Sequence, residues 1–245
     1  MSGGVFMEAG KRLIVALDVS TLEQAKSLVA ELHDLVGMFK VGLELFCSHG
    51  PRAVEIVLEQ GGRVFLDLKY HDIPNTVAGA ARAAVRLGVS MFNLHIAGGV
   101  EMMRAALEAA GQEAGTEAAP KILGVTVLTS LGAGQLRDEL GLERPPAEQV
   151  VFWAGQALDC GLSGVVASPQ EIRRIRQRCG EGFLIVTPGI RPAASSLDDQ
   201  KRISTPEEAL HSGADYLVVG RPITKAPDRR QATIAIIKEM EANNQ

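Results

Sequence analysis

Eight short apolar runs recur along the chain, and each is followed by a stretch with the polar and apolar spacing of a helix. The runs are rich in branched aliphatic residues and do not alternate cleanly, which is typical of parallel strands buried on both faces. They are Leu13–Leu17, Phe39–Val41, Val64–Leu68, Met91–Ile96, Ile122–Leu128, Gly164–Ala167, Phe183–Val186 and Tyr216–Val219. Eight strand–helix units in succession predict one α/β domain, a (β/α)₈ TIM barrel.

The segments between the runs carry helix signals. Leu22, Ala25, Leu28 and Leu32 follow the 3.6-residue period of an amphipathic helix. Helices are also expected at about 101–110, 148–159 and 227–241. Candidate capping boxes are Ser20-x-x-Glu23, Ser168-x-x-Glu171 and Thr205-x-x-Glu208, and prolines suited to a first helical turn are Pro51, Pro169 and Pro206.

The main alternative fold is an open doubly wound sheet. That fold predicts a G-x-G-x-x-G loop after the first strand, but the chain continues there as Asp18-Val19-Ser20-Thr21. The barrel is therefore favoured. We expect residues 1–10 to form a flexible N-terminal leader and residues 11–245 to form the single barrel domain.

Composition narrows the class of protein. The 245 residues include 25 Lys and Arg against 29 Asp and Glu, a net charge of −4, which argues against a broad cationic surface for nucleic acid. Three widely spaced cysteines, Cys47, Cys160 and Cys179, favour neither a disulfide framework nor a zinc cluster. Membrane-helix and signal-peptide patterns are missing from the sequence. We therefore expect a cytoplasmic protein with neither a nucleic-acid nor a membrane partner.

Polar side chains gather at the ends of the apolar runs. In a (β/α)₈ barrel the carboxyl ends of the strands form the face that carries active sites, so these residues are the candidates for a site. A strand must end in something polar, but that explanation weakens where charged residues lie within or beside apolar runs. The strand-end residues are Asp18, Lys40, Asp67, Lys69, His95, Thr129, Ser168, Arg191 and Arg221.

The densest cluster lies between residues 67 and 76. Asp67 and Lys69 are two residues apart, so on a strand both side chains point to the same face. With Lys40 on the neighbouring strand and Asp72 nearby, they would form an array of alternating charge. One interpretation is a structural ion-pair network. The other, which we favour, is a preorganised electrostatic site in which a lysine acts as general acid.

A second cluster follows the last two runs, at residues 187–192 and 219–222. Loops after strands seven and eight are the usual phosphate site of this barrel. Gly220 allows a backbone N–H to approach closely, and Arg221 offers a guanidinium fork to phosphate oxygens. The polar segment 193–204 is predicted either to cover a phosphate or to be a solvated loop. The five histidines show no metal-ligand spacing.

The block Asp67-x-Lys69-x-x-Asp72-Ile73-Pro74-Asn75-Thr76 resembles the signature of the orotidine 5′-phosphate decarboxylase family. Weaker matches occur on both sides of this block, in the order in which the family has them, over nearly the whole chain after about residue 11. They are Leu17-Asp18, Phe39-Lys40-Val41-Gly42, Leu128-Thr129-Ser130, Thr187-Pro188-Gly189-Ile190-Arg191, Asp199-Gln200-Lys201-Arg202 and Val218-Val219-Gly220-Arg221-Pro222.

The resemblance implies decarboxylation of orotidine 5′-monophosphate (OMP) to uridine 5′-monophosphate (UMP) in de novo pyrimidine synthesis. It also implies a homodimer with shared active sites that uses neither metal nor organic cofactor. Lys69 would protonate C6 of the pyrimidine, Asp67 would lie near the departing carboxylate, and Asp72 would reach the partner's site. The implied catalytic set is Lys69, Asp67, Asp72 and Lys40, and the implied substrate-binding set is Asp18, Lys40, Asp67, Ile73, Thr76, Thr129, Arg191, Gln200, Gly220 and Arg221.

The rival hypothesis is a Mg²⁺-dependent phosphosugar decarboxylase or aldolase of the same barrel superfamily. Such relatives are 3-keto-L-gulonate 6-phosphate decarboxylase and hexulose-phosphate synthase. They share the D-x-K-x-x-D core, and their metal site is similar in having an acidic residue on the second strand. Here that strand carries Lys40, where a divalent ion would need a carboxylate. A non-catalytic nucleotide-binding barrel is a further alternative, but it would not need both Lys69 and Asp72.

Overall fold

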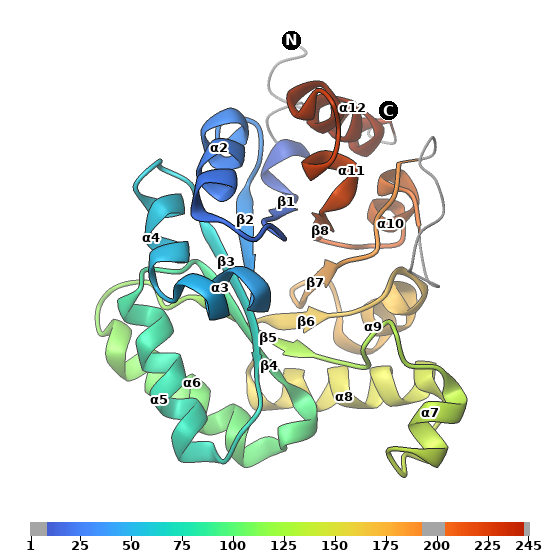
Figure 1. Ribbon diagram of the computed structural model, residues 1–245. Coiled ribbons are helices and arrows are strands. Elements are labelled where there is room, and N and C mark those ends of the chain that lie inside the picture. The colour runs from blue at the N-terminus through green and yellow to red at the C-terminus, as the bar shows by residue number, and fades with distance from the viewer. Residues whose placement is uncertain (1–8, 193–203, 243–245) are drawn as a thin grey trace.

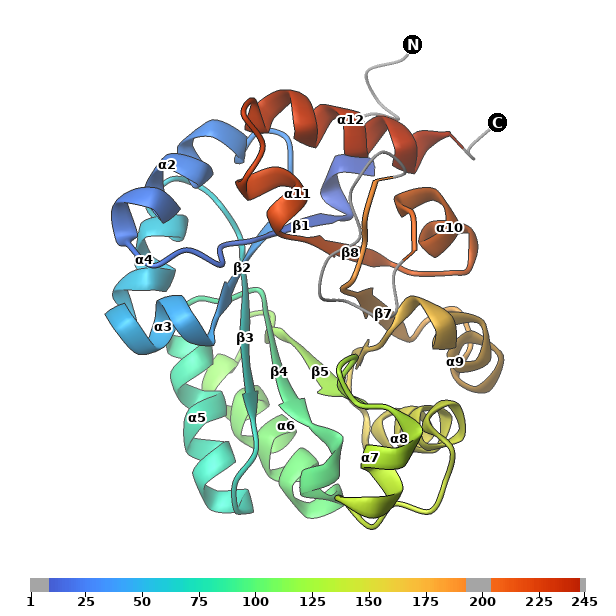
Figure 2. The ribbon, with the colours of Figure 1, turned by 45° about the vertical axis from the view of Figure 1, so that its right-hand side comes forward.

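Eight parallel strands close into a barrel in chain order, and helices surround it (Figures 1 and 2). The computed structural model describes residues 9–192 and 204–242. The strands are β1 (Leu13–Ala16), β2 (Met38–Gly42), β3 (Val64–Tyr70), β4 (Met91–His95), β5 (Lys121–Val125), β6 (Gly164–Val166), β7 (Leu184–Thr187) and β8 (Tyr216–Val219). The predicted (β/α)₈ barrel is confirmed, and every predicted apolar run overlaps one of these strands.

The helices lie outside the barrel. They are α2 (Leu22–Leu32), α3 (Leu43–His49), α4 (Arg52–Leu58), α5 (Pro74–Arg86), α6 (Val100–Ala114), α7 (Ala133–Asp138), α8 (Pro146–Cys160), α9 (Ile172–Cys179), α10 (Pro206–His211), α11 (Arg221–Thr224) and α12 (Arg229–Glu241). Short 3₁₀ turns span Ile96–Gly98 and Pro169–Glu171. The three helices expected near 101–110, 148–159 and 227–241 correspond to α6, α8 and α12.

The helix starts confirm one predicted capping box and correct two. Thr205 and Glu208 form a reciprocal box at α10. At α2 the cap is Thr21 rather than Ser20, because Thr21 has the extended backbone of a cap and its hydroxyl accepts from the N–H of Gln24. Ser168 caps the short 3₁₀ turn instead of an α-helix, accepting from the N–H of Gln170.

The apolar core has two layers. Ile14, Met38, Phe65, Met91 and Leu123 belong to a cluster that fills the barrel interior. A larger cluster packs the outer faces of the strands against the helices and includes Ala9, so the packed core begins two residues before the expected domain start at residue 11. Residues 1–8 of the expected leader lie outside the described residues, and the proposed division of the chain stays a prediction.

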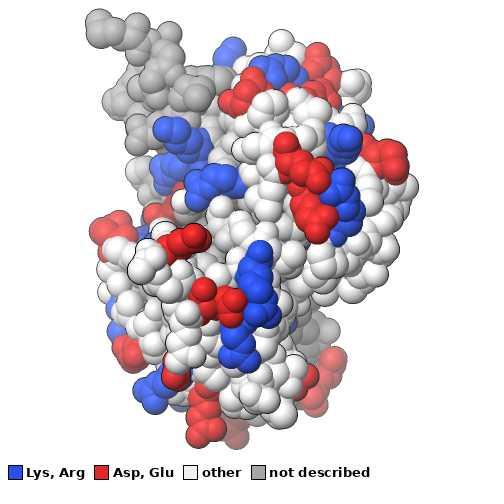
Figure 3. Space-filling view, turned by 90° about the vertical axis from the view of Figure 1, so that its left-hand side faces the viewer, with Lys and Arg blue, Asp and Glu red and all other residues white. Residues whose placement is uncertain are grey.

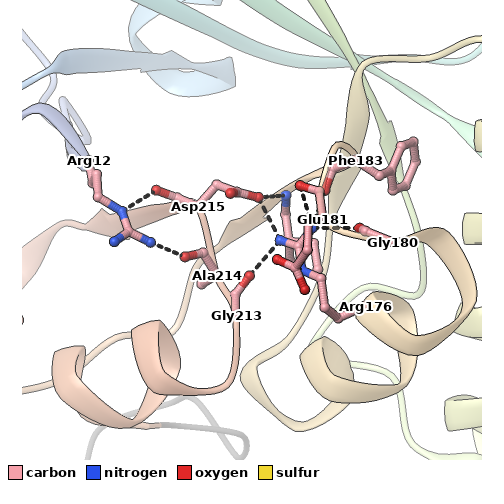
Figure 4. Close-up of polar contacts among 9 residues, drawn as sticks. Arg12, Arg176, Gly180, Glu181, Phe183, Gly213, Ala214 and Asp215 are labelled. Carbon is pink, nitrogen blue, oxygen red and sulfur yellow. Dashed lines mark hydrogen bonds and ion pairs between the residues drawn. The ribbon is translucent and has the colours of Figure 1, made fainter. Parts of the chain in front are cut away.

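Two arginines, Arg12 and Arg176, form a cluster of polar contacts, the arginine clamp, at the amino ends of the strands (Figure 4). This end lies opposite the carboxyl-end face. Arg12, just before β1, donates to the carbonyls of Ala214 and Asp215, which precede β8. Arg176 of α9 donates to the carboxylate of Asp215 at 2.8 Å and to carbonyls on both sides, including Phe183 and Gly213. This clamp ties β1, β7, β8 and α9 together.

The outer surface carries both signs of charge. On the face that lies at the left of Figure 1, Lys and Arg are interspersed with Asp and Glu (Figure 3). On α4, for example, Arg52 pairs with Glu55 and Glu59. Within residues 9–192 and 204–242, none of the helices combines the length and apolar character needed to cross a membrane.

Candidate active site

A cavity of about 250 Å³ opens at the carboxyl ends of the strands. Alternate residues of each strand point into the barrel and so line this cavity. The polar side chains come from β1, β2 and β3 or the residues just after them, and the apolar ones mainly from β5 and β6 and the residues after these strands. Of the predicted site residues, Asp18, Lys40, Asp67, Lys69, Thr129, Arg191 and Gly220 line it; Ser168, Phe65, Val125, Val127, Val166 and Pro188 are among its other lining residues.

Four of these side chains form a line of alternating charge. Lys40 Nζ lies 3.0 Å from Asp18 Oδ1 and 3.2 Å from Asp67 Oδ2. Lys69 Nζ lies 2.7 Å from Asp67 Oδ1. The order along the line is therefore Asp18, Lys40, Asp67 and Lys69. Lys40, Asp67 and Lys69 of the predicted array come together, but Asp18 rather than Asp72 supplies the second carboxylate, and each lysine lies beside a carboxylate.

Burial and pairing act in opposite directions on the two inner members. Burial alone would lower the pKa of Lys40, but the carboxylates of Asp67 and Asp18 outweigh it and raise that pKa above its usual value. Burial alone would raise the pKa of Asp67, but Lys40 and Lys69, with a hydrogen bond from Asn93, lower it. Both groups are therefore charged near neutral pH, and the field they produce is fixed by the fold.

The third strand departs from regular geometry where it enters the cavity. Its pairing with β4 runs from Leu66 opposite Phe92 to Tyr70 opposite Leu94, with a register shift between these pairs. Lys69 has φ +52°, and among the described residues it is the one non-glycine residue with positive φ. Asp67 and Lys69 do point into one cavity, as predicted, but Lys69 reaches it from a bulge rather than from an extended strand.

Asn93 of β4 is a site-region residue that sequence reasoning missed. Its side chain is fully buried, donates to Asp67 Oδ1 at 2.7 Å and accepts from the backbone N–H of Lys69 at 2.8 Å. The available signal was a single amide in the apolar run Met91–Ile96. Such a residue needs partners when it is buried.

Three of the predicted residues lie together at one place outside the cavity of this chain. Asp72, Ile73 and Thr76 stand at the start of α5, exposed to solvent, and Ile73 is 67% exposed. Asp72 Oδ1 accepts from the backbone N–H of Ile73 at 2.6 Å and does not join the charge line. These three side chains therefore do not line the cavity of their own chain.

The predicted phosphate side is only partly described. Arg191 and Gly220 line the cavity, whereas Arg221 is the first residue of α11 and lies beside that wall. Gln200 lies outside the described residues, as does most of the polar segment 193–204. Arg191 and Ser204, on either side of the undescribed residues, are bonded to each other, because the N–H of Arg191 donates to the carbonyl of Ser204 at 3.0 Å.

His95 lies near the Lys69 end of the charge line, and His71 packs against it. The rings of His71 and His95 lie 5.3 Å apart, centroid to centroid, next to the bulge. Burial lowers the pKa of His95, and the neighbouring His71 and Lys69 lower it further. The described part of the chain contains no group of three or more His, Cys, Asp or Glu side chains placed to hold a metal ion.

Comparisons with known proteins agree on one family. The model of the orotidine 5′-phosphate decarboxylase / HUMPS family matches residues 11–236. An orotidine 5′-phosphate decarboxylase of Moorella thermoacetica is 58% identical over 237 residues, covering 96% of this chain and 94% of that protein. The enzyme of that name from Syntrophomonas wolfei is 55% identical, covering 96% of this chain and all of that protein.

Solved structures give the same result. A crystal structure of orotidine 5′-phosphate decarboxylase from Lactobacillus acidophilus superposes with a TM-score of 0.83 at 40% identity and covers 94% of this chain and 99% of that one. The corresponding structure from Pyrococcus horikoshii gives a TM-score of 0.75 at 27% identity, covering 93% of this chain and 98% of that one.

Proposed function

Because the chain belongs to the orotidine 5′-phosphate decarboxylase / HUMPS family and is a carboxy-lyase, we propose that its charged cavity decarboxylates OMP with neither metal nor organic cofactor. The family and the relatives support decarboxylation of OMP in pyrimidine biosynthesis. The observation that carries the finer proposal is the contact of 2.7 Å between Lys69 Nζ and Asp67 Oδ1 at the cavity wall.

Decarboxylation of OMP requires a fixed electrostatic field at C6 and a proton for C6. When the C6–carboxylate bond of OMP breaks, CO₂ leaves and the electron pair stays on C6, with no adjacent carbonyl to delocalise it. Without a cofactor as electron sink, the protein must stabilise this pair. The Lys69 ammonium does so electrostatically and then donates its proton to C6, giving UMP.

The carboxylates hold the two lysines in place. Asp67 keeps Lys69 near C6, and Lys40, between Asp67 and Asp18, prevents the two acidic groups from facing each other uncompensated. We assign Asp18 and Lys40 also to the ribose hydroxyls and Thr129 to the pyrimidine. This assignment is supported by their common position on the cavity wall.

We assign the phosphate of OMP to the wall formed by Arg191 and Gly220, with Arg221 and Gln200 as further ligands. A guanidinium matches phosphate oxygens in a two-point contact. Binding energy from this remote group favours the closed complex and offsets unfavourable contacts at the reacting end.

We further propose a homodimer in which Asp72, Ile73 and Thr76 complete the partner's site. Their exposure in one chain, away from its own cavity, supports this arrangement. The test mixes two inactive variants, Lys69→Ala and Asp72→Ala, under conditions that allow subunit exchange. A hybrid dimer then has one site with both native residues, so activity returns; no recovery in a dimer shown to exchange contradicts shared sites.

The proposed location is the cytoplasm, which fits three free cysteines and a biosynthetic role. The proposed metal independence rests on Lys40, whose ammonium occupies the space between Asp18 and Asp67 that a divalent cation would need. A bound Mg²⁺ there would have to displace this ammonium.

The deciding experiment follows conversion of OMP to UMP by ultraviolet absorbance with excess EDTA. Rapid turnover identifies the substrate and the metal-free reaction together. Turnover that returns only when Mg²⁺ is restored contradicts the metal-free mechanism. No turnover under either condition by folded protein favours the phosphosugar alternative, which is then tested with a hexulose phosphate and Mg²⁺.

A further inference from the structure

Asn93 donates a hydrogen bond to Asp67 of the charge line but does not line the cavity. We infer that Asn93 is the positioning residue that bridges the bulge in β3 and sets the Lys69 ammonium at its working position. This inference rests on the proposed role of Lys69 as proton donor. Asn93 would act only through Asp67 and Lys69.

The bulge leaves a gap in the backbone ladder that Asn93 fills. Between the pairs Leu66–Phe92 and Tyr70–Leu94, strand β3 has the three residues 67–69, whereas β4 has Asn93 alone. One residue's backbone cannot pair with three. The side-chain oxygen of Asn93 instead accepts from the backbone N–H of Lys69 at 2.8 Å and replaces the missing ladder acceptor.

The partners of Asn93 also fix the orientation of its amide. The ionised carboxylate of Asp67 only accepts, so the group 2.7 Å from its Oδ1 is the NH₂ of Asn93. The backbone N–H of Lys69 only donates, so it faces the amide oxygen. An amide supplies a donor and an acceptor from one rigid plane, which neither a carboxylate nor an aliphatic side chain does.

The geometry of Lys69 depends on this support. A lysine with φ +52° is in a left-handed conformation that side chains disfavour, and such a residue persists where its surroundings hold it. Asn93 ties that backbone to the same carboxylate oxygen that receives Lys69 Nζ. The backbone of Lys69 is thus held by Asn93 of β4, and its ammonium is held by Asp67.

The main test replaces Asn93 with leucine, which is branched at the same carbon but neither donates nor accepts. Loss of the bridge should let Lys69 leave the left-handed region and its ammonium move away from Asp67. We expect kcat to fall by about 100-fold, because a misplacement near 1 Å has an effect of that order. The Kd of the product UMP should change by less than about threefold, because the ribose and phosphate walls stay intact. Asn93→Ser is the second variant if Asn93→Leu does not fold, since its hydroxyl is too short to reach both partners.

A third variant, Asn93→Asp, separates the two hydrogen bonds. It keeps an acceptor for the Lys69 N–H, but it loses the donor to Asp67 and places a second carboxylate against it. Like charges raise carboxylate pKa values, so the acid limb of its kcat–pH profile should move to higher pH. Asn93→Leu also removes the hydrogen bond that lowers the pKa of Asp67, but it adds no charge, so its acid limb should move in the same direction by less.

The matched control is Thr126→Val. Thr126, next to β5, is also buried, but it does not line the cavity or touch the charge line. Its substitution removes one hydrogen bond, from the hydroxyl to the carbonyl of Val166 at 2.9 Å, whereas Asn93→Leu removes two. The kcat of Thr126→Val should stay within about threefold of wild type. If Asn93→Leu lowers kcat no more than this control, or weakens UMP binding as much as it lowers kcat, the inference is wrong.

A crystal structure of Asn93→Leu gives a readout that does not depend on activity. A changed φ at Lys69, or a longer contact between its ammonium and Asp67, supports the inference, and an unchanged bulge overturns it. If wild-type protein fails to decarboxylate OMP, the proposed function fails first, while this structure still decides whether Asn93 positions Lys69.

Discussion

Lys69 Nζ lies 2.7 Å from Asp67 Oδ1, although the backbone of Lys69 has left the conformation of the strand that carries both residues. The contact places the proposed proton donor and its carboxylate partner at the same point of the cavity wall. A donor held this way needs no reorganisation when charge develops on the substrate.

Removing the Lys69 ammonium should therefore abolish chemistry far more than binding. For Lys69→Ala we expect kcat to fall by at least about 10⁴-fold, at the upper end of general-acid effects because an electrostatic contribution is lost as well. The Kd of UMP, measured by calorimetry, should change by less than about tenfold. Equal losses in kcat and in UMP affinity would contradict its role as proton donor.

A methyl group at Gly42 should disturb Lys40 without disturbing the fold. A Cβ there would lie 3.0 Å from Lys40 Nζ and 3.5 Å from Asp18 Oδ1, so the flexible lysine tip must shift by a few tenths of an ångström. We expect kcat/KM of Gly42→Ala to fall by about tenfold, less than the effect of a 1 Å displacement, with little change in Tm.

The control for this substitution is Gly111→Ala on α6. A Cβ at that position meets nothing within 4 Å, and alanine favours a helix over glycine by about 0.5–1 kcal/mol. Gly111→Ala should thus keep wild-type kinetics and unfold at a slightly higher temperature. Wild-type kinetics in Gly42→Ala would show that the position of Lys40 is less restricted than the contacts indicate.

The arginine clamp at the other end of the barrel should govern stability rather than catalysis. Arg176→Ala leaves the Asp215 carboxylate and several carbonyls without their guanidinium partner. Breaking such a largely buried pair costs about 3 kcal/mol, which corresponds to a Tm lower by roughly 6–12 °C for a chain of this size. Calorimetry measures the change.

Arg52→Ala provides the comparison for the clamp. Arg52 pairs with Glu55 and Glu59 on the exposed face of α4, where solvent screens the charges. Its removal should leave Tm nearly unchanged. A similar loss of stability in both arginine variants would show that ion pairing in general, rather than the buried clamp, stabilises this barrel.

Protonation of His95 should destabilise the fold in mild acid. Burial, together with His71 and Lys69, lowers the folded-state pKa of His95 below its usual value of 6.5. Between these two pKa values the unfolded chain binds more protons, so stability rises with pH through that interval and is lost as the pH falls below about 6.5. Urea unfolding at pH 7.5 and 5.5 should show a smaller pH effect for His95→Gln than for wild type.

His211→Gln is the matched control for this pH effect, because His211 is exposed in the last turn of α10. Its difference in stability between the two pH values should equal that of wild type. If His95→Gln also behaves like wild type, the buried ring does not contribute to the acid sensitivity of the fold.

The sequence alone determined the barrel, because the features that specify it are local. Each apolar run is long enough to be a buried strand, and the residues at its end must lie on the common carboxyl face once the strands are parallel. Asp18, Lys40, Asp67 and Lys69 could be assigned to that face from their position after or within a run. Thr205 and Glu208 likewise specify a helix start through contacts three residues apart.

Only the tertiary structure decided how these residues are held. The register shift between β3 and β4, the left-handed backbone of Lys69 and the burial of Asn93 depend on contacts between strands far apart in sequence. A single amide in an apolar run does not reveal which partners it will meet. The exposure of Asp72 and Ile73 was equally hidden, because the local motif places them beside Lys69 while the chain carries them away from its own cavity. Strand periodicity is a property of neighbouring residues, whereas side-chain hydrogen bonds across a bulge arise only when the barrel has closed.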